Sequence, residues 1–166
     1  STASALHPNR DQLYVVGPAC VLALNSKTLT VMNEFSHGMQ DANIRSAQVY
    51  DSQLFVGLYL EYNEPNARYG AIIVHSLESG REGERLRTIK LPYCLRSFTI
   101  HQDRIIASLY LPHFDGPDRA VIELSMAGEQ ISKQDPMPSS SGEFFGISSR
   151  GDELLFADSD RQRVYT

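Results

Sequence analysis

Four short runs of aliphatic, β-branched and aromatic residues recur along this chain of 166 residues, and their spacing constrains the fold more than any other feature. The anchor residues of these runs, Leu13, Leu54, Ile105 and Leu154, are separated by 41, 51 and 49 residues. A turn signal containing Asp precedes each run, and turn residues of this kind tolerate positive φ or bond their own backbone. A period of this length indicates an architecture that stacks copies of one small unit.

Each unit has the same order of predicted strands. A strand of mixed small and apolar residues precedes the turn, the anchored run follows it, and a third apolar strand comes next. In three of the units a fourth, more polar strand follows, over 28–35, 85–91 and 129–133, as expected of a solvated outer edge. No window keeps apolar residues at helical spacing for three turns, so helices are not expected.

We therefore predict an all-β fold made of β-propeller blades, each a four-stranded antiparallel meander. The blades are expected at about 1–36, 44–92, 95–134 and 143–166, within a single domain. A β-sandwich is the alternative, but the repeated strand order favours the propeller. The last unit ends after its third strand, so we expect the chain to be part of a larger propeller of six or seven blades. Further blades of the same or another chain would complete that propeller.

The last unit, 146–165, resembles an NHL-type propeller repeat. The matching features are the pair Gly146 and Ile147, the turn glycine Gly151, the apolar run that ends in Ala157 and Asp158, and Arg163 before an apolar pair. The first three units lack the Ala-Asp pair and resemble generic WD40-like blades. The NHL resemblance implies the substrate-recognition domain of a tripartite-motif ubiquitin ligase, or an RNA-binding module.

The longest predicted loops all fall on one face of the expected propeller, over 36–44, 60–69, 111–118 and 135–142. Long loops on one face of a rigid scaffold are the usual binding surface. Acidic residues outnumber basic ones there, and aromatic side chains lie among them, which favours a protein or peptide partner, in particular a basic one. The residues expected to bind it are Asp41, Glu61, Tyr62, Glu64, Arg68, Tyr69, His113, Phe114, Asp115 and Asp118.

The function expected from these features is a non-catalytic protein-interaction scaffold without a cofactor. A net charge of −5 disfavours RNA, whose binding usually needs a basic face. A metal-dependent enzyme of the lyase or lactonase type stays open as a second alternative, with His37 and Asp41, or His113 and Asp115, as the available ligands. The serines at 139–141 lack the flanking glycines of a nucleophile elbow.

The two cysteines, Cys20 and Cys94, belong to no CxxC pair and are expected to be buried thiols, with a disulfide between them left open. No apolar run approaches the roughly 20 residues that a membrane-spanning helix needs. No signal peptide is visible at the start of the sequence. These features favour a cytoplasmic location.

Overall fold

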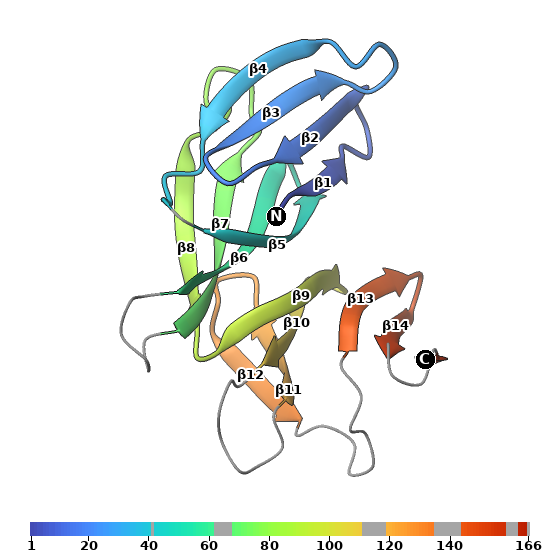
Figure 1. Ribbon diagram of the computed structural model, residues 1–166. Coiled ribbons are helices and arrows are strands. Elements are labelled where there is room, and N and C mark those ends of the chain that lie inside the picture. The colour runs from blue at the N-terminus through green and yellow to red at the C-terminus, as the bar shows by residue number, and fades with distance from the viewer. Residues whose placement is uncertain (41, 62–67, 111–118, 135–143, 159–162, 166) are drawn as a thin grey trace. The chain divides into compact units, whose positions relative to one another are not determined.

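A computed structural model of the 166 residues describes the chain over 1–40, 42–61, 68–110, 119–134, 144–158 and 163–165 (Figure 1). Side chains that border the gaps, at 61, 68, 110, 119, 134, 144–145, 158 and 163–165, fall outside the description. The chain divides into two compact units, Ser1–Leu91 and Pro92–Thr166. Each unit is described by itself below.

The described residues form antiparallel strands in four sheets, and consecutive strands are neighbours in every sheet. Unit 1 holds blade 1 and blade 2. Their strands are β1 (Ala3–Leu6), β2 (Gln12–Val16), β3 (Cys20–Asn25) and β4 (Val31–Ser36), then β5 (Asn43–Tyr50), β6 (Gln53–Glu61), β7 (Arg68–Ser76) and β8 (Arg85–Leu91). Unit 2 holds blade 3 and blade 4. Their strands are β9 (Cys94–His101), β10 (Arg104–Tyr110), β11 (Arg119–Ser125) and β12 (Gln130–Gln134), then β13 (Phe144–Arg150), β14 (Glu153–Asp158) and β15 (Arg163–Tyr165).

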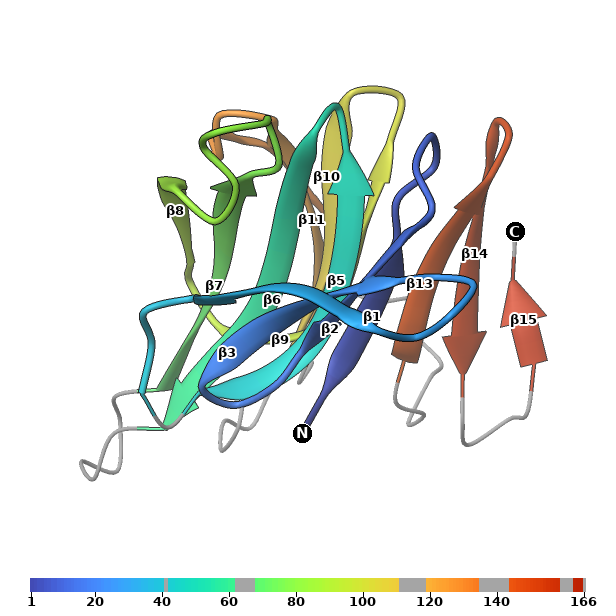
Figure 2. The ribbon, with the colours of Figure 1, turned by 90° about the horizontal axis from the view of Figure 1, so that it is seen from above.

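The antiparallel meander predicted for each of the four sequence repeats is thereby confirmed, one repeat in each blade. Figure 2 shows the order clearly in β13, β14 and β15, which follow one another side by side. That all 166 residues form one domain stays a prediction, as does the total number of blades.

Each sheet has two faces because side chains alternate along a strand. We call the face that carries the anchor residue of the second strand the anchor face, and the other one the opposite face. The anchor face of blade 1 holds Leu13, and its opposite face holds Tyr14.

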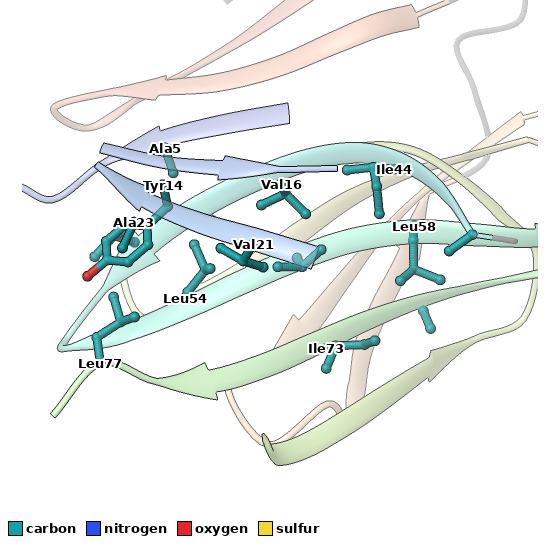
Figure 3. Close-up of a cluster of buried hydrophobic side chains, with 14 of the residues drawn as sticks. Ala5, Tyr14, Val16, Val21, Ala23, Ile44, Leu54, Leu58, Ile73 and Leu77 are labelled. Atoms are coloured by element: carbon teal, nitrogen blue, oxygen red, sulfur yellow. The ribbon is translucent and has the colours of Figure 1, made fainter. Parts of the chain in front are cut away.

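The core of unit 1 lies between blade 1 and blade 2 (Figure 3). Blade 1 contributes its opposite face, with small aliphatic residues and one aromatic: Ala5, Tyr14, Val16, Val21 and Ala23. Blade 2 contributes its anchor face, where leucine and isoleucine predominate: Ile44, Val49, Leu54, Val56, Leu58, Leu60, Ala71 and Ile73. Small side chains facing large ones allow two sheets to interdigitate at native density.

In unit 2, the first strands of blade 3 and blade 4 contact each other through hydroxyl groups. Thr99 Oγ1 donates to Ser149 Oγ at 3.4 Å, and Ser149 Oγ donates to the Ile100 carbonyl at 3.2 Å. The Ile147 amide donates to Ser97 Oγ at 3.4 Å. The side chains that meet come from β9 and β13, so blade 3 and blade 4 also stack through their first strands.

Two hairpins turn as the sequence predicts. Asp51 and Ser52, and likewise Gln102 and Asp103, have positive φ values between 45° and 58°. Two successive residues of this kind match the right-handed twist of the flanking strands.

Three expectations are wrong in detail. The loop expected over 60–69 is partly strand, because β6 continues to Glu61 and β7 begins at Arg68, with Leu60 opposite Tyr69. The longest connections were expected on one face of the propeller alone, but residues 77–84, which join β7 to β8, form a long connection on the other face. The edge strand β4 is less polar in its exposed positions than expected, because Val31 and Met32 are 61% and 56% exposed.

The cysteines differ in burial, although both were expected inside. Cys94 is a buried thiol, whereas Cys20 is half-buried at the start of β3. Burial raises the pKa of the Cys20 thiol, and the neighbouring Glu34 carboxylate raises it further. Among the described residues, no helix is long and apolar enough to cross a membrane.

Candidate binding pocket at the end of blade 1

A pocket of about 470 Å³ opens at one end of blade 1. Its walls come from the turn between β2 and β3, with Pro18 and Ala19, and from the connection between β4 and β5. The second wall consists of Ser36, Gly38, Met39 and Gln40. None of the lining residues that the structure describes carries a charge, and these residues suit an uncharged group with a few hydrogen-bonding atoms.

His37 holds the two walls together. Its side chain is completely buried, and its ring lies within hydrogen-bonding distance of each wall. Nε2 lies 3.0 Å from the Gly17 carbonyl, and Nδ1 accepts a bond from the Met39 amide at 3.3 Å. A neutral imidazole protonated on Nε2 satisfies both contacts.

A second set of bonds fixes the rim of the pocket. The Gly38 amide donates to Ser36 Oγ at 3.0 Å, and Ser36 Oγ donates to the Ala19 carbonyl at 3.4 Å. Arg85 Nη2 donates to the His37 carbonyl at 2.8 Å, so the start of β8 holds the connection between β4 and β5 in place. Gly38 has a φ of +76°, a conformation that favours glycine, and a Cβ there would displace the Arg85 guanidinium. The pocket is therefore preorganised by backbone and buried side chains.

The pair of His37 and Asp41 that the metal alternative requires stays untested, because Asp41 lies outside the described residues. Both ring nitrogens of His37 lie within hydrogen-bonding distance of protein groups. No cluster of three or more His, Cys, Asp or Glu side chains that could hold a metal occurs in the part of the chain that the structure describes.

Of the residues expected to bind a partner, only Tyr69 can be placed with its side chain. Tyr69 is half-buried on β7 and packs against the core of unit 1. Lys90 Nζ lies 4.9 Å from the centroid of the Tyr69 ring. Glu61 and Arg68 lie at facing strand ends, but their side chains fall outside the description. The other expected residues also lie outside the described ranges: Asp41, Tyr62, Glu64, His113, Phe114, Asp115 and Asp118. The predicted surface therefore stays a prediction, except that its first segment, 36–44, contributes four residues to the pocket.

A polar contact between blade 1 and blade 2 was not predicted. Glu82, in the connection between β7 and β8, accepts bonds from Tyr14 Oη at 3.2 Å and from Asn33 Nδ2 at 3.0 Å. Burial raises the pKa of Tyr14 strongly, and the Glu82 carboxylate raises it further. The three residues are far apart in sequence, so no local motif could have revealed the contact.

His75 lies on β7 opposite Arg85, the first residue of β8, and is almost fully buried. Its Nδ1 lies 3.1 Å from the Gly83 carbonyl, and the Phe35 ring centroid lies 5.4 Å from its own. Burial lowers the pKa of His75, and the nearby Arg85 and His37 lower it further against the opposing effect of the Gly83 carbonyl.

This lowered pKa predicts that unit 1 loses stability as the pH falls below about 6.5, the ordinary pKa of histidine in an unfolded chain. Below that pH the imidazole of His75 binds a proton in the unfolded chain, whereas in the folded chain it stays neutral to a lower pH. The loss is at most about 1.4 kcal/mol per pH unit for one histidine. Chemical denaturation at pH 7.5, 6.5 and 5.5 measures it.

A His75→Gln variant provides the control for this prediction. Glutamine keeps a side-chain donor but cannot titrate, so its stability should depend less on pH. His7, whose pKa is also lowered by burial and by Arg10, acts in the same direction and is present in both proteins. Equal pH slopes for the two proteins would contradict the role assigned to His75.

Comparisons with known proteins were made for sequence and for structure. No family model matches the sequence, and no curated protein matches it either. Solved structures do match. The hydrazine synthase of Kuenenia stuttgartiensis aligns with a TM-score of 0.69 and 18% identity, over 94% of this chain and 43% of that one.

Two similar structures are propellers by description. The β-propeller domain of Cps50 (Swd1) from Myceliophteria thermophila aligns with a TM-score of 0.63 and 12% identity, over 96% of this chain and 49% of that one. The WD40 β-propeller domain of Doa1 aligns with a TM-score of 0.63 and 14% identity, over 99% of this chain and 48% of that one. The fold is that of β-propeller blades. The chain spans less than half the length of each of these three structures.

Proposed function

We propose that this chain is a non-catalytic protein-interaction module that binds a peptide segment of its partner at the pocketed end of blade 1. The observation that carries the proposal is the pocket itself, preformed and fixed by His37 and Arg85. A rigid concavity with apolar walls and a few polar atoms suits the anchoring side chain of a bound peptide. WD40 propellers among the similar structures support a scaffold role of this general kind.

The side chains that line the pocket indicate which side chain of the partner it can bind. Pro18, Ala19 and Met39 offer apolar contact, while Ser36 and Gln40 offer hydrogen-bonding groups. An uncharged side chain of the partner therefore fits the pocket. Basic residues beside that anchor would face the acidic loop residues expected from the sequence, among them Asp41, Glu61 and Glu64. A finer version of the proposal, the substrate-recognition domain of a ubiquitin ligase, rests on the NHL-type resemblance of 146–165 alone.

The test blocks the pocket without changing the fold. Ala19 is exposed on the rim, so an Ala19→Trp variant should fill the pocket with its side chain. Peptides selected from a random display library on the unmodified chain serve as probes, and fluorescence anisotropy measures their Kd. We expect Ala19→Trp to weaken binding at least about tenfold, as the loss of one anchor contact does.

A Thr28→Trp variant is the matched control, because Thr28 is also exposed and lies in the turn between β3 and β4, at the opposite end of blade 1. It should bind the peptides like the unmodified chain. Equal loss of affinity in both variants, or in neither, would contradict the proposal. Tight, salt-sensitive binding of single-stranded RNA in a gel-shift assay would favour the RNA-binding alternative instead.

A further inference from the structure

The outer strand of blade 2 carries an exposed threonine among basic side chains. Thr88 lies in the middle of β8, the edge strand of its sheet (Figure 1), and its side chain is exposed. Arg85 and Arg87 precede it, and Lys90 follows it. In the whole sequence, Thr88 is the one serine or threonine with two basic residues among the three positions before it. Many protein kinases select an acceptor hydroxyl by a charge pattern of this kind.

The register of β8 puts Thr88 on the same face as two of these basic residues. Lys90 shares that face because it lies two residues further along the strand. Arg85, three residues before Thr88, would fall on the other face of a regular strand. The register between β7 and β8 shifts at this point, however, so that Arg85 lies opposite His75 and Thr88 lies opposite Ile73. These partners are two residues apart on β7, and Arg85 therefore shares the anchor face of blade 2 with Thr88.

The cations on either side of Thr88 are open to an anion. Arg85 and Lys90 form no ion pair with another residue that the structure describes. Arg85 donates from Nη2 to the His37 carbonyl at 2.8 Å, and Lys90 lies over the Tyr69 ring. A guanidinium has five N–H donors, so Arg85 can bind a phosphate and keep its bond to the His37 carbonyl. A phosphate on Thr88 would therefore meet two cations on its own face.

We propose that Thr88 is a phosphorylation site for a protein kinase that recognises arginine before its acceptor, and that Arg85 and Lys90 hold the phosphate. Thr88 Oγ1 forms a bond to the γ-phosphorus of ATP while the bond between that phosphorus and ADP breaks, and the hydroxyl proton passes to the catalytic aspartate of the kinase. The product has about two negative charges at pH 7 and three acceptor oxygens, which suit charge-assisted bonds to both cations. This modification is independent of whether the pocket binds a peptide.

Thr30 provides a matched comparison within the same chain. It is also exposed, and the basic residue Lys27 lies three positions before it. The Lys27 ammonium is paired with the Asp11 carboxylate at 2.8 Å, however, and the Thr30 hydroxyl shares a hydrogen bond of 2.8 Å with the Thr28 hydroxyl. Recognition by basic charge should therefore favour Thr88 over Thr30.

Kinase treatment of the folded chain tests the acceptor. The full chain and a synthetic peptide of residues 81–93 are incubated with ATP and a purified arginine-directed protein kinase, and peptide mass mapping locates the phosphate. We expect Thr88 of the folded chain to be modified at least about tenfold faster than Thr30, the preference that one hydrogen bond to a charged group provides. Modification of the peptide but not of the folded chain, of neither, or of Thr30 in preference to Thr88 would overturn the proposal.

Phosphorus-31 nuclear magnetic resonance of the modified chain tests the two cations. A pH titration gives the second pKa of the phosphate, which is about 6 without neighbouring charges. We expect a value about half a unit or more below that of the phosphorylated peptide, because cations held close favour the dianion. Lys90→Gln should raise this pKa, whereas Lys27→Gln, which removes another exposed lysine, should leave it unchanged. Equal values in chain and peptide, or equal values in the two variants, would contradict the role of Arg85 and Lys90.

Discussion

A Gly83→Ala variant is expected to unfold with a free energy about 2–4 kcal/mol lower than that of the unmodified chain, combining left-handed backbone strain with overpacking. Gly83 has a φ of +87°, a conformation that residues with a Cβ rarely adopt. A Cβ placed there would lie 2.6 Å from Phe35 Cγ, closer than such atoms approach. The Phe35 ring also packs against the His75 ring, so it has little room to move. Guanidinium unfolding followed by far-UV circular dichroism measures the loss.

Gly80 offers the matched control for this substitution. It lies in the same connection with a φ of +82°, but no atom lies within 4 Å of the position that a Cβ would take. Gly80→Ala therefore adds backbone strain alone and should cost about 1–2 kcal/mol. Equal free energies of unfolding for the two variants would contradict the close packing of Gly83 against Phe35.

Tyr14→Ala should cost unit 1 about 3–5 kcal/mol, the range for removing a buried aromatic ring. The side chain is fully buried in the core between the two blades, at the end of the cluster where Ala23 and Leu77 lie (Figure 3). Its hydroxyl is one of two groups that hydrogen-bond Glu82 across the blade interface. Removing it therefore leaves both a cavity and a carboxylate with fewer partners.

A Tyr14→Phe variant separates these two effects. It keeps the ring and removes the hydroxyl, which lies within hydrogen-bonding distance of both Glu82 and Gln12, so it should lose about 1–2 kcal/mol. Hydrogen exchange should show faster opening of both blades of unit 1 in Tyr14→Ala, because the ring belongs to their shared core. Faster exchange confined to blade 1 would indicate that the two blades do not share one core.

Strand positions could be predicted from the sequence because each strand has its own local signal. The anchors Leu13 and Ile105 lie in the strands Gln12–Val16 and Arg104–Tyr110, each an apolar run that follows a turn signal. The more polar strand predicted over 85–91 is a strand over those residues. The sequence did not reveal the ends of β6 and β7, because the polar residues after Leu60 resemble a loop. The cross-strand pair of Leu60 and Tyr69 extends both strands.

The pocket and the contact at Glu82 were beyond such reasoning. The contact at Glu82 depends on segments brought together only by the stacking of blade 1 on blade 2. The pocket depends on the pairing of strands within blade 1 and on Arg85, which reaches the His37 carbonyl from a strand of the other blade. The sequence held one clue, since Gly38 directly follows a histidine between two predicted strands. A glycine at that point indicates close approach of a neighbour, but not which one.

The most direct test of the proposed role maps bound peptide onto the chain by nuclear magnetic resonance. A selected peptide is titrated into ¹⁵N-labelled protein, and the backbone amide shifts are followed. The account predicts that the largest shifts fall on Ala19, Ser36, Gly38, Met39 and Gln40, at the pocketed end of blade 1. Shifts concentrated instead on the other end of the blades, at Lys27 to Leu29 and Glu78 to Glu82, would contradict it.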